Sequence, residues 1–522
     1  MNREQLIAPE HYNLVSEFEK YATGAKKKAL IYVNGQGEKK EITYDELMEL
    51  ANKVANVFTS NGLQKGDVVL VMVPRLIEAY VTYIGALKAG LVVIPSSEML
   101  RPSDIEYRLA HSHAKAIIAF EAFTEQFNEV NNMEDVKLFV VGKAQEGQLS
   151  LTELLATASA DFVAPETKSS DMAFLSYTSG TTGKPKGVVH THGWGYAHLR
   201  TASASWLGIE EGDVVWATAA PGWQKWIWSP FLSVLGSGAT GLVYDGKFDV
   251  TTYLELIKNY QVNVICCTPT EYRFMAKAEK LETYDLSSIR SAVSAGEPLN
   301  REVIDIFDKT FALQVRDGYG QTENTLLVGT MLGMEARPGS MGKPTPGNRV
   351  EIIDDEGNPA AVGEVGDIAV HVSTPALFKE YLSDPERTKM QFRGEYYVTG
   401  DRARMDEDGY FWFEGRSDDI IISSGYTIGP FEVEDALTKH PAVRECAVVA
   451  SPDAVRGNIV KAFIVLREPA RQTEEGLVKD LQEHVKTLTA PYKYPRKIEF
   501  VDELPKTASG KIMRVELRRQ EH

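Results

Sequence analysis

The chain has 522 residues, a formal net charge of −17 and a hydrophobic fraction of 43 %. This length exceeds one ordinary hydrophobic core and predicts a globular protein of two or more domains. The negative charge argues against general nucleic-acid binding and against docking on anionic membranes. The segment from Lys486 onwards is nevertheless basic, with nine Lys and Arg against five Asp and Glu, and could receive an anionic ligand.

The cysteines and the N-terminus predict a cytoplasmic protein. Cys266, Cys267 and Cys446 are too few for a disulfide framework and are expected to be buried thiols. The N-terminal residues lack the apolar core of a secretion signal, and no apolar run reaches the length of a membrane span. We therefore expect no stable membrane association and no nucleic-acid partner, and we leave homo-oligomer formation open.

Short apolar runs alternate with amphipathic stretches between residues 30 and 150. The runs predict buried strands and the stretches predict helices. The strands are expected at 68–73, 91–95 and 116–120, and the helices at 77–89 and 104–113. Strand–helix–strand alternation predicts a parallel sheet with covering helices.

An apolar run at 172–175, expected to be a buried strand, leads into Tyr177-Thr-Ser-Gly-Thr-Thr-Gly-Lys-Pro-Lys-Gly187. Glycines let the backbone turn its N–H groups inward, and hydroxyl and ammonium donors suit a polyphosphate. The close spacing of Gly180 and Gly183, and Pro185 after Lys184, exclude a Walker A loop. Composition alone also fits a flexible linker, but the strand leading in favours phosphate binding.

Three later strands are expected to end in polar loops that contain Gly or Pro. The strands are expected at 262–267, 289–294 and 313–316. The loops are Thr268-Pro-Thr270, Ala295-Gly-Glu-Pro298 and Asp317-Gly-Tyr-Gly-Gln-Thr-Glu323. A helix is expected to start at Glu271, after the first loop. Ligands of open α/β sheets bind beyond the carboxyl ends of strands, although Gly and Pro also mark ordinary turns.

Beyond Pro346 the sequence changes to short strands and turns, and Gly415-Arg-Ser-Asp-Asp419 predicts a domain boundary. A small α+β unit is expected after it. Its helices are predicted at 430–439 and 473–487, and its strands at 446–450 and 460–466.

Five motifs carry a resemblance to one family. The loop at 177–187 resembles the ATP-phosphate loop of the adenylate-forming enzymes, which include acyl-CoA synthetases, luciferase and peptide-synthetase adenylation domains. The other motifs are Tyr319-Gly-Gln-Thr-Glu323, Tyr397-Val-Thr-Gly-Asp401, Gly415-Arg416 and Pro505-Lys-Thr-Ala-Ser-Gly-Lys511. They match in type and order, so the chain is identified as a member of this family from about residue 10 to its end.

The resemblance implies an α/β fold in which a large N-terminal domain contains stacked, mostly parallel sheets and a β-rich subdomain. A small α+β C-terminal domain is expected to move about a hinge at Asp418. The expected divisions are an AMP-binding domain at 1–415, a hinge at 416–418 and a catalytic-lysine and CoA domain at 419–522.

The resemblance also implies that the chain binds ATP and Mg²⁺. The expected ATP and AMP contacts are Thr178, Ser179, Gly180, Thr181, Thr182, Gly183, Lys184, Lys186, Gly296, Glu297, Pro298, Asp317, Gly318, Tyr319, Gly320, Gln321, Asp401 and Arg416. Tyr319 offers a face for the purine, Asp401 can bind the ribose hydroxyls, and Arg416 can hold phosphate by its fork. Without the resemblance, Tyr319 equally fits core packing and Asp401 an ordinary turn.

Three residues are expected to carry the chemistry. Glu323 is a hard oxygen ligand suited to Mg²⁺, and Thr322 resembles the residue that contacts the α-phosphate. Lys511 resembles the lysine that bridges the attacking carboxylate and the α-phosphate, a contact worth about 3–4 kcal/mol at the transition state. As a tail lysine alone it would be solvated and inert. It also resembles a lysine that is acetylated in related synthetases, which would remove its charge.

The implied reaction has two halves: a carboxylate attacks the α-phosphate of MgATP, and a thiol then displaces AMP. Coenzyme A is the expected thiol. The positions expected to bind it are Ser424, Gly425, Tyr426, Arg456, Lys486, Tyr494, Pro495 and Arg496. One departure stands out, because Thr427 occupies a position where the family usually has an arginine that contacts ATP phosphates. We expect weaker ATP binding or slower adenylation as a result.

The acyl pocket is expected at Gly320 and Trp223. Acetate-specific relatives carry tryptophan at the position of Gly320, so glycine predicts a longer acid. The run Pro221-Gly-Trp-Gln-Lys-Trp-Ile-Trp228 resembles medium-chain acyl-CoA synthetases, with Trp223 as the pocket wall and Trp226 and Trp228 better explained as core. Three alternatives stay open: an aryl-CoA ligase acting on benzoate or a relative, an adenylate-binding protein weakened by Thr427, and an adenylation module serving a carrier protein.

Overall fold

The computed structural model describes the chain except residues 132, 179–184, 297–298, 300, 417–418, 424–425, 454–455, 475, 507–511 and 522, and the side chains of 422, 426, 427, 457 and 470. The chain divides into two compact units. Unit 1 comprises Met1–Val350 and His371–Phe392, and unit 2 comprises Glu351–Val370 and Arg393–His522.

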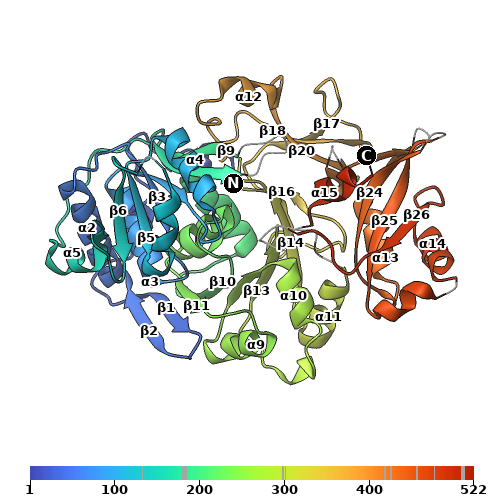
Figure 1. Cartoon of the computed structure of the whole chain (residues 1–522), viewed down its shortest axis with the longest axis horizontal. Coiled ribbons are helices and arrows are strands. Elements are labelled where there is room, and N and C mark those ends of the chain that lie inside the picture. The colour runs from blue at the N-terminus through green and yellow to red at the C-terminus, as the bar shows by residue number, and fades with distance from the viewer. Residues whose placement is uncertain are drawn as a thin grey trace. The chain divides into compact units, whose positions relative to one another are not determined.

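The larger sheet of unit 1 has nine strands in the order β16-β15-β14-β13-β12-β10-β11-β1-β2 (Figure 1). The six strands from β14 to β1 are parallel, and β2, β15 and β16 join antiparallel at the edges. The strands are β1 (Lys28–Asn34), β2 (Lys39–Thr43), β10 (Val214–Ala217), β11 (Thr240–Asp245), β12 (Val264–Cys267), β13 (Ser291–Ala295), β14 (Val315–Gly320), β15 (Leu326–Gly329) and β16 (Lys343–Pro344).

The second sheet of unit 1 has seven strands in the order β7-β6-β5-β3-β4-β8-β9. All neighbours are parallel except β8 and β9, which form an antiparallel pair. The strands are β3 (Val68–Met72), β4 (Val92–Pro95), β5 (Ala116–Phe120), β6 (Lys137–Val141), β7 (Leu149–Ser150), β8 (Met172–Thr178) and β9 (Lys186–Thr191).

Two packed helices, α2 (Tyr44–Ser60) and α3 (Ile77–Lys88), share one buried core with strands from both sheets. A capping box of Thr43 and Glu46 starts α2 by satisfying backbone N–H groups at its first turn. Gly85 lets the helices approach, because a Cβ there would lie 2.5 Å from Cγ1 of Val54. The other helices of unit 1 are α1 (Ser16–Glu19), α4 (Pro102–Ser112), α5 (Leu151–Thr157), α6 (His192–His198), α7 (Gln224–Trp226), α8 (Val234–Gly236), α9 (Val250–Asn259), α10 (Pro269–Met275), α11 (Arg301–Phe311) and α12 (Pro385–Met390).

Unit 2 contains two five-stranded sheets. One has the order β17-β18-β20-β19, with β21 paired to β20, and the other has the order β23-β22-β25-β24, with β26 paired to β25. Helices α13 and α14 pack on the second sheet around a core that includes Val433 and Leu481. The elements are β17 (Val350–Ile353), β18 (Val365–His371), β19 (Phe392–Arg393), β20 (Tyr396–Met405), β21 (Phe411–Arg416), β22 (Ile421–Ser423), β23 (Tyr426–Ile428), α13 (Pro430–Thr438), β24 (Val443–Asp453), β25 (Gly457–Leu466), α14 (Leu477–Leu488), β26 (Lys497–Phe500) and α15 (Arg514–Arg519).

The predicted α/β fold class is confirmed, with a large parallel-sheet N-terminal part and a smaller C-terminal part. The three cysteines are buried and unpaired as expected. Within the described part of the chain, no helix is long and apolar enough to span a membrane. Several boundaries differ from those predicted. Strand β24 (Val443–Asp453) is three residues longer at each end than the predicted 446–450, and α14 (Leu477–Leu488) starts at Leu477 rather than at residue 473. Helix α10 starts at Pro269 rather than Glu271, and β14 runs through to Gly320 because it pairs with β15, so Asp317–Gly320 is strand rather than loop.

Trp226 is a core residue, as the sequence indicates: it is 1 % exposed and lies 4.8 Å from the ring of Tyr83 and 5.3 Å from that of Phe231. We predict that Trp226→Ala lowers the free energy of unfolding by about 3–5 kcal/mol, the usual cost of truncating a buried aromatic ring. Trp223, which is 37 % exposed, provides the control. Trp223→Ala is expected to change stability by no more than about 0.5 kcal/mol, and equal shifts of the urea midpoint in the two variants would contradict the assignment.

Candidate active site

Glu323 is the centre of a buried polar network in unit 1. It follows β14 and is only 7 % exposed. Its Oε1 accepts hydrogen bonds from Nζ of Lys186 at 3.1 Å and from the hydroxyl of Tyr381 at 2.8 Å. Lys186 also donates to the Tyr381 hydroxyl at 3.0 Å and lies 4.5 Å from the centre of its ring. These two donors leave Oε2 without a hydrogen bond to any residue that the structure describes.

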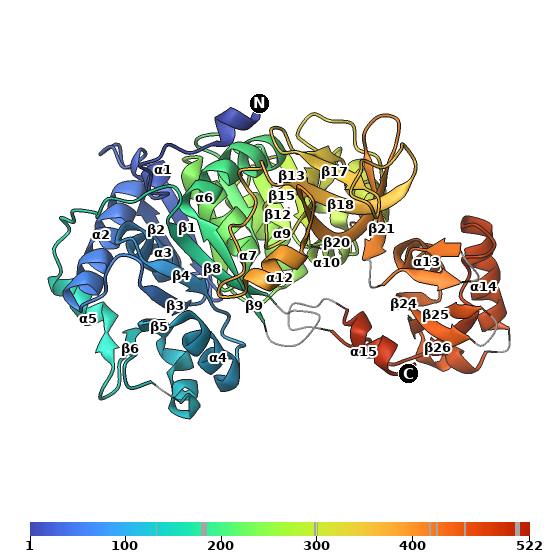
Figure 2. The ribbon, with the colours of Figure 1, turned by 90° about the horizontal axis from the view of Figure 1, so that it is seen from above.

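The segment from Phe378 to Leu382 explains how Tyr381 reaches this position. Its backbone hydrogen-bonds along the free edge of β9, through Leu382 N to Gly187 O, Lys379 N to Val189 O and Val189 N to Glu380 O. At its start, Phe378 N donates to the carbonyl of Glu323 at 2.7 Å. Figure 2 shows α12, which follows this segment, beside β9. The segment therefore connects Glu323 to the strand that carries Lys186.

Two aromatic residues of α6 hydrogen-bond to the loop that follows Glu323. Trp194 Nε1 donates to the carbonyl of Asn324 at 2.9 Å, and Nδ1 of His198 lies 2.5 Å from Oγ1 of Thr325. Burial lowers the pKa of His198 to about 4, so the ring is neutral near pH 7. Neutral side chains of α6 thus hold the loop that follows the charged residue Glu323.

His190, on β9, lies in the same buried layer, with its ring centre 4.4 Å from that of Trp194. Burial lowers its pKa to about 3, an effect that the facing backbone of Thr322 partly offsets. Its two ring nitrogens have no hydrogen-bond partner within 3.5 Å among the described residues. The His190 ring is therefore neutral near pH 7 and packs against Trp194.

Two glycines of β14 are required by close contacts. A Cβ at Gly318 would lie 2.6 Å from the ring of Trp206, and a Cβ at Gly320 would lie 2.2 Å from the carbonyl oxygen of Thr325. Glycine at 320 therefore has a local reason besides the size of an acyl pocket, because any side chain there would displace the β14–β15 hairpin. Tyr319 lies between them at a register shift of the pairing with β15.

Asp317, on the same strand, is buried and has an unusual proton affinity. Burial raises the pKa of its carboxyl to about 7, although the backbone N–H groups of Gly318 and Leu299 and the charge of Lys225 act in the opposite direction. Gly318 N donates to Oδ1 at 2.8 Å. Lys225 itself donates to the carbonyl of Ala295, at the end of β13, at 2.6 Å. The half-buried ammonium thus lies near two neighbouring strand ends.

Thr178 and Lys186 close the base of the predicted phosphate loop. They are opposite one another in the β8–β9 ladder. The hydroxyl oxygen of Thr178 is buried and has no hydrogen-bond partner among the described residues. Gly296 follows β13 with φ of +110°, a conformation that favours glycine. The unpartnered hydroxyl of Thr178 and the positive φ of Gly296 are both features expected of a ligand-binding loop.

In unit 2, the structure brings together two residues that the sequence analysis treated separately. Asp401 on β20 is the register partner of Arg416 on β21. Asp401 is 7 % exposed, and its N–H donates to Oγ1 of Thr399 at 3.2 Å. The hydroxyl of Thr399 in turn donates to the carbonyl of Ile368 at 2.8 Å. The carboxylate predicted for ribose and the guanidinium predicted for phosphate are thus neighbours.

Three of the predicted CoA residues also gather in unit 2. Nζ of Lys486 lies 4.3 Å from the ring centre of Tyr494, and the guanidinium of Arg496 lies 4.7 Å from it. Arg496 also donates to the Tyr494 hydroxyl at 2.7 Å. Pro495 is held by its carbonyl, which accepts from Gln482 at 3.0 Å. Arg456 is exposed and is placed before β25, where its N–H donates to Asp453.

Several predicted residues lie outside the described part of the chain. They are Ser179, Gly180, Thr181, Thr182, Gly183, Lys184, Glu297, Pro298, Asp418, Ser424, Gly425 and Lys511, together with the side chains of Tyr426 and Thr427. Tyr381 was not predicted at all, because it belongs to none of the five motifs. Among the described residues, no group of three or more His, Cys, Asp and Glu is arranged to hold a metal ion.

Comparison with known proteins assigns the family. Residues 18–382 match the AMP-binding enzyme family and residues 432–511 match the AMP-binding enzyme C-terminal domain. The chain belongs to the AMP-binding enzyme family, as its motifs indicated.

Individual relatives then define the class of ligase. The chain is 61 % identical to the acyl-CoA ligase YtcI of Bacillus subtilis, described as uncharacterized, across 100 % of this chain and 98 % of that one. It is 42 % identical to the mitochondrial acyl-coenzyme A synthetase ACSM3 of Rattus norvegicus, across 98 % and 91 %. Among solved structures, an anthranilate CoA ligase bound to anthranoyl-AMP superposes with a TM-score of 0.91 at 31 % identity, across 100 % and 99 %. The chain is an AMP-forming acyl-CoA ligase.

Asp317 predicts a pH dependence of stability. Its pKa in the folded chain, about 7, exceeds the ordinary value of 3.8, so the folded chain retains a proton that the unfolded chain releases. This carboxyl therefore lowers the free energy of unfolding progressively as the pH rises from about 4 to about 7. We expect Asp317→Asn to remove that part of the pH dependence and to raise stability most at pH 8, as measured by urea unfolding.

The exposed carboxylate of Asp305 provides the matched control, since its side chain is 61 % exposed. Asp305→Asn should leave the pH profile of the wild-type protein unchanged. A profile for Asp317→Asn parallel to that of the wild-type protein would contradict the assignment.

Proposed function

We propose that this acyl-CoA ligase activates a medium-chain fatty acid in two steps at the Glu323 network. The acid's carboxylate attacks the α-phosphate of ATP, forming an acyl-adenylate and releasing pyrophosphate. The thiol of coenzyme A then attacks the acyl carbonyl, forming the thioester and releasing AMP. The observation that carries this proposal is the nearly buried Glu323, held by Lys186 and Tyr381 beside the glycine-containing end of β14.

Glu323 fits the role of the Mg²⁺ ligand. Its Oε2 accepts no hydrogen bond from the described residues, and one or two carboxylates with substrate phosphates suffice for this ion. Mg²⁺ would neutralise charge on the phosphates of ATP. Lys186 would stay close enough to contribute a second positive charge, while Tyr381 would keep the carboxylate oriented through a hydrogen bond that does not depend on the ion.

The remaining roles follow the matched motifs. Thr178, Thr322 and the loop at 179–184 would bind phosphate, Asp401 the ribose and Arg416 a phosphate group. Tyr494 and its two cations, Lys486 and Arg496, form a basic aromatic cluster suited to the nucleotide of coenzyme A. We further propose that the C-terminal part pivots at Asp418, so that Lys511 serves the first step and is withdrawn for the second.

The choice of acid depends on the pocket near Trp223 and Gly320. Trp223 has an exposed surface that an acyl chain could cover, and its run of tryptophans resembles medium-chain synthetases. Aryl acids are the second candidate, because structural relatives include an anthranilate CoA ligase and a benzoate CoA ligase of Burkholderia xenovorans, the latter 32 % identical with a TM-score of 0.85 across 97 % of this chain and 100 % of that one. Each buried methylene adds about 0.8 kcal/mol, so selectivity should change gradually with chain length.

A panel of acids tests the substrate class. Acyl-CoA formation should be measured with straight-chain acids from acetate to decanoate and with benzoate and anthranilate, at fixed ATP and coenzyme A. We expect kcat/KM to peak at intermediate chain lengths. A peak at benzoate or anthranilate would replace the main proposal with the aryl alternative, and no thioester from any acid would contradict both.

We expect only the first of the two half-reactions to depend on Lys511. We predict that Lys511→Ala slows acyl-adenylate formation by about 10²–10³-fold, because a cationic contact that stabilises the transition state is lost. The conversion of supplied acyl-adenylate and coenzyme A into acyl-CoA should keep its rate. Single-turnover measurement of each half-reaction checks this, and equal loss in both would contradict a role confined to the first step.

Thr427 provides a gain-of-function test. We predict that Thr427→Arg lowers the KM for ATP or raises the adenylation rate, because it restores a cation at a position where the family contacts phosphate. An expected gain of about tenfold corresponds to one charge-assisted hydrogen bond. Thr427→Gln, which adds length without charge, should give no gain. If neither parameter improves in the arginine variant, Thr427 does not limit this enzyme.

A further inference from the structure

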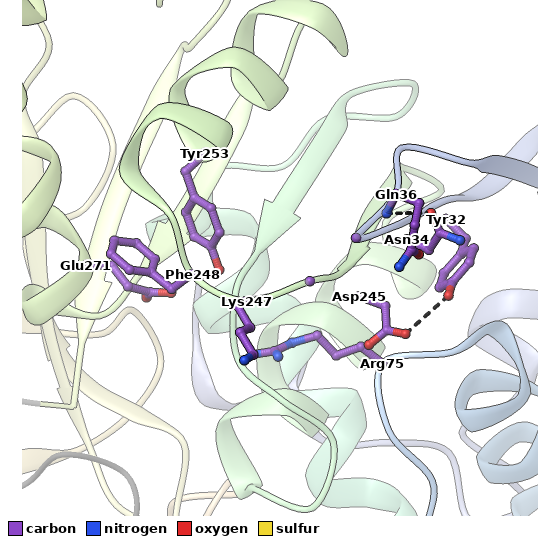
Figure 3. Close-up of a pocket in the computed structure, with 11 residues that line it drawn as sticks. Tyr32, Asn34, Gln36, Arg75, Asp245, Lys247, Phe248, Tyr253 and Glu271 are labelled. Carbon is purple, nitrogen blue, oxygen red and sulfur yellow. Dashed lines mark hydrogen bonds between the residues drawn. The ribbon is translucent and has the colours of Figure 1, made fainter.

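A polar cavity of about 730 Å³ opens in unit 1 at the carboxyl ends of β1 and β11 (Figure 3). These neighbouring parallel strands end at Asn34 and Asp245. None of the residues assigned above to ATP, coenzyme A or the acyl chain lines this cavity. It nevertheless lies at the same edge of the nine-stranded sheet as the end of β14, the edge where ligands of parallel sheets bind. Its volume is in the range of small-molecule sites.

Two cations in the cavity have no acidic partner in the described part of the chain. Arg75, which is half-buried before α3, donates through Nη2 to the carbonyl of Thr218 at 2.8 Å. Lys247 is exposed on the loop after β11. Neither side chain forms an ion pair with a described carboxylate. Since neither cation is engaged in an ion pair with a described carboxylate, both can donate charge-assisted hydrogen bonds to an anionic group of a ligand.

The two acids of the cavity are held by neutral donors instead. Oδ2 of Asp245 accepts from the hydroxyl of Tyr32 at 3.2 Å. Oε2 of Glu271 accepts from the hydroxyl of Thr218 at 2.7 Å and from the N–H and hydroxyl of Thr268 at 2.7 and 2.8 Å. These contacts fix the two carboxylates in place. Their second oxygens can accept hydrogen bonds from ligand hydroxyl or amino groups.

An aromatic surface completes the lining. Phe248 is 38 % exposed and packs edge-to-face on Tyr253, with ring centres 4.7 Å apart. In Figure 3 this pair lies on one side of the cavity and the turn residues Asn34 and Gln36 lie on the other, with Arg75 between them. A flat ring covering Phe248 would remove apolar surface from water.

We propose that this cavity is a second, non-catalytic binding site for a nucleoside monophosphate. The phosphate would bind Arg75 and Lys247, the base would cover Phe248, and ribose hydroxyls would donate to Asp245 or Glu271. AMP is the first ligand to test, because it is a product of this enzyme's own reaction. The site would allow AMP to bind without occupying the catalytic centre.

Equilibrium dialysis with AMP alone tests the proposal by stoichiometry. The wild-type chain should bind two AMP molecules, one at the catalytic centre and one in the cavity. In Lys247→Glu, and in Arg75→Gln, the second site should weaken by about tenfold or more, because a charge-assisted contact is lost. Lys247 is exposed, so its variant should retain the thermal stability of the wild-type protein even if Arg75→Gln does not.

Lys277, an exposed lysine after α10 and outside the cavity, supplies the matched control. Lys277→Glu should still bind two AMP molecules. One AMP per chain in the wild-type protein that Lys247→Glu still binds with unchanged affinity, or two with unchanged affinity in Lys247→Glu, would overturn the proposal. Failure of the catalytic assignment would instead remove the AMP site that does not respond to residue 247, so the two failures can be distinguished.

Discussion

A carboxylate that is nearly sealed from water must be compensated, and this requirement organises unit 1 around Glu323. Its partners are distant in sequence: Lys186 begins β9 in the seven-stranded sheet, and Tyr381 lies on the segment that extends that sheet. Glu323 itself follows β14 of the nine-stranded sheet. Removing one partner of a buried ion pair leaves an uncompensated charge that costs about 3–5 kcal/mol. The same contacts that orient the carboxylate therefore also join the two sheets.

Charged residues and neutral residues contact different parts of the loop around Glu323. The charged groups contact Glu323 at the start of the loop. Neutral aromatic residues of α6 hydrogen-bond to the next two residues, Asn324 and Thr325. Glycines at 318 and 320 let the strand approach Trp206 and the hairpin without steric conflict. The cavity near Arg75 lies at the same sheet edge but uses other strands.

Much of the fold could be predicted from sequence because its strands are short apolar runs that alternate with amphipathic stretches. β5 was predicted residue for residue, and β3, β4 and α3 within one or two residues at each end. The start of α10 had a readable signal that the prediction did not use, the capping box formed by Thr268 and Glu271 around Pro269. The extension of β14 to Gly320 depends on pairing with β15, which local patterns do not report.

The candidate site was predictable where a motif carried it and not where tertiary contact created it. Glu323 and Lys186 belong to motifs, and the structure adds that they form an ion pair. Tyr381 has no motif around it, and only the pairing of residues 379–382 with β9 brings it to Glu323. The pairing of Asp401 with Arg416 likewise follows from strand register rather than from either motif alone.

The most direct test of the account is ATP–pyrophosphate exchange in the absence of coenzyme A, which isolates the adenylation step. The account predicts exchange that depends on added carboxylic acid in the wild-type protein. In Glu323→Gln, which is nearly isosteric but uncharged, exchange should fall by about a hundredfold or more, as expected when a transition-state electrostatic contact is removed. Exchange of equal rate in the two proteins, or no acid-dependent exchange in the wild-type protein, would contradict the assignment of Glu323 as the centre of the site.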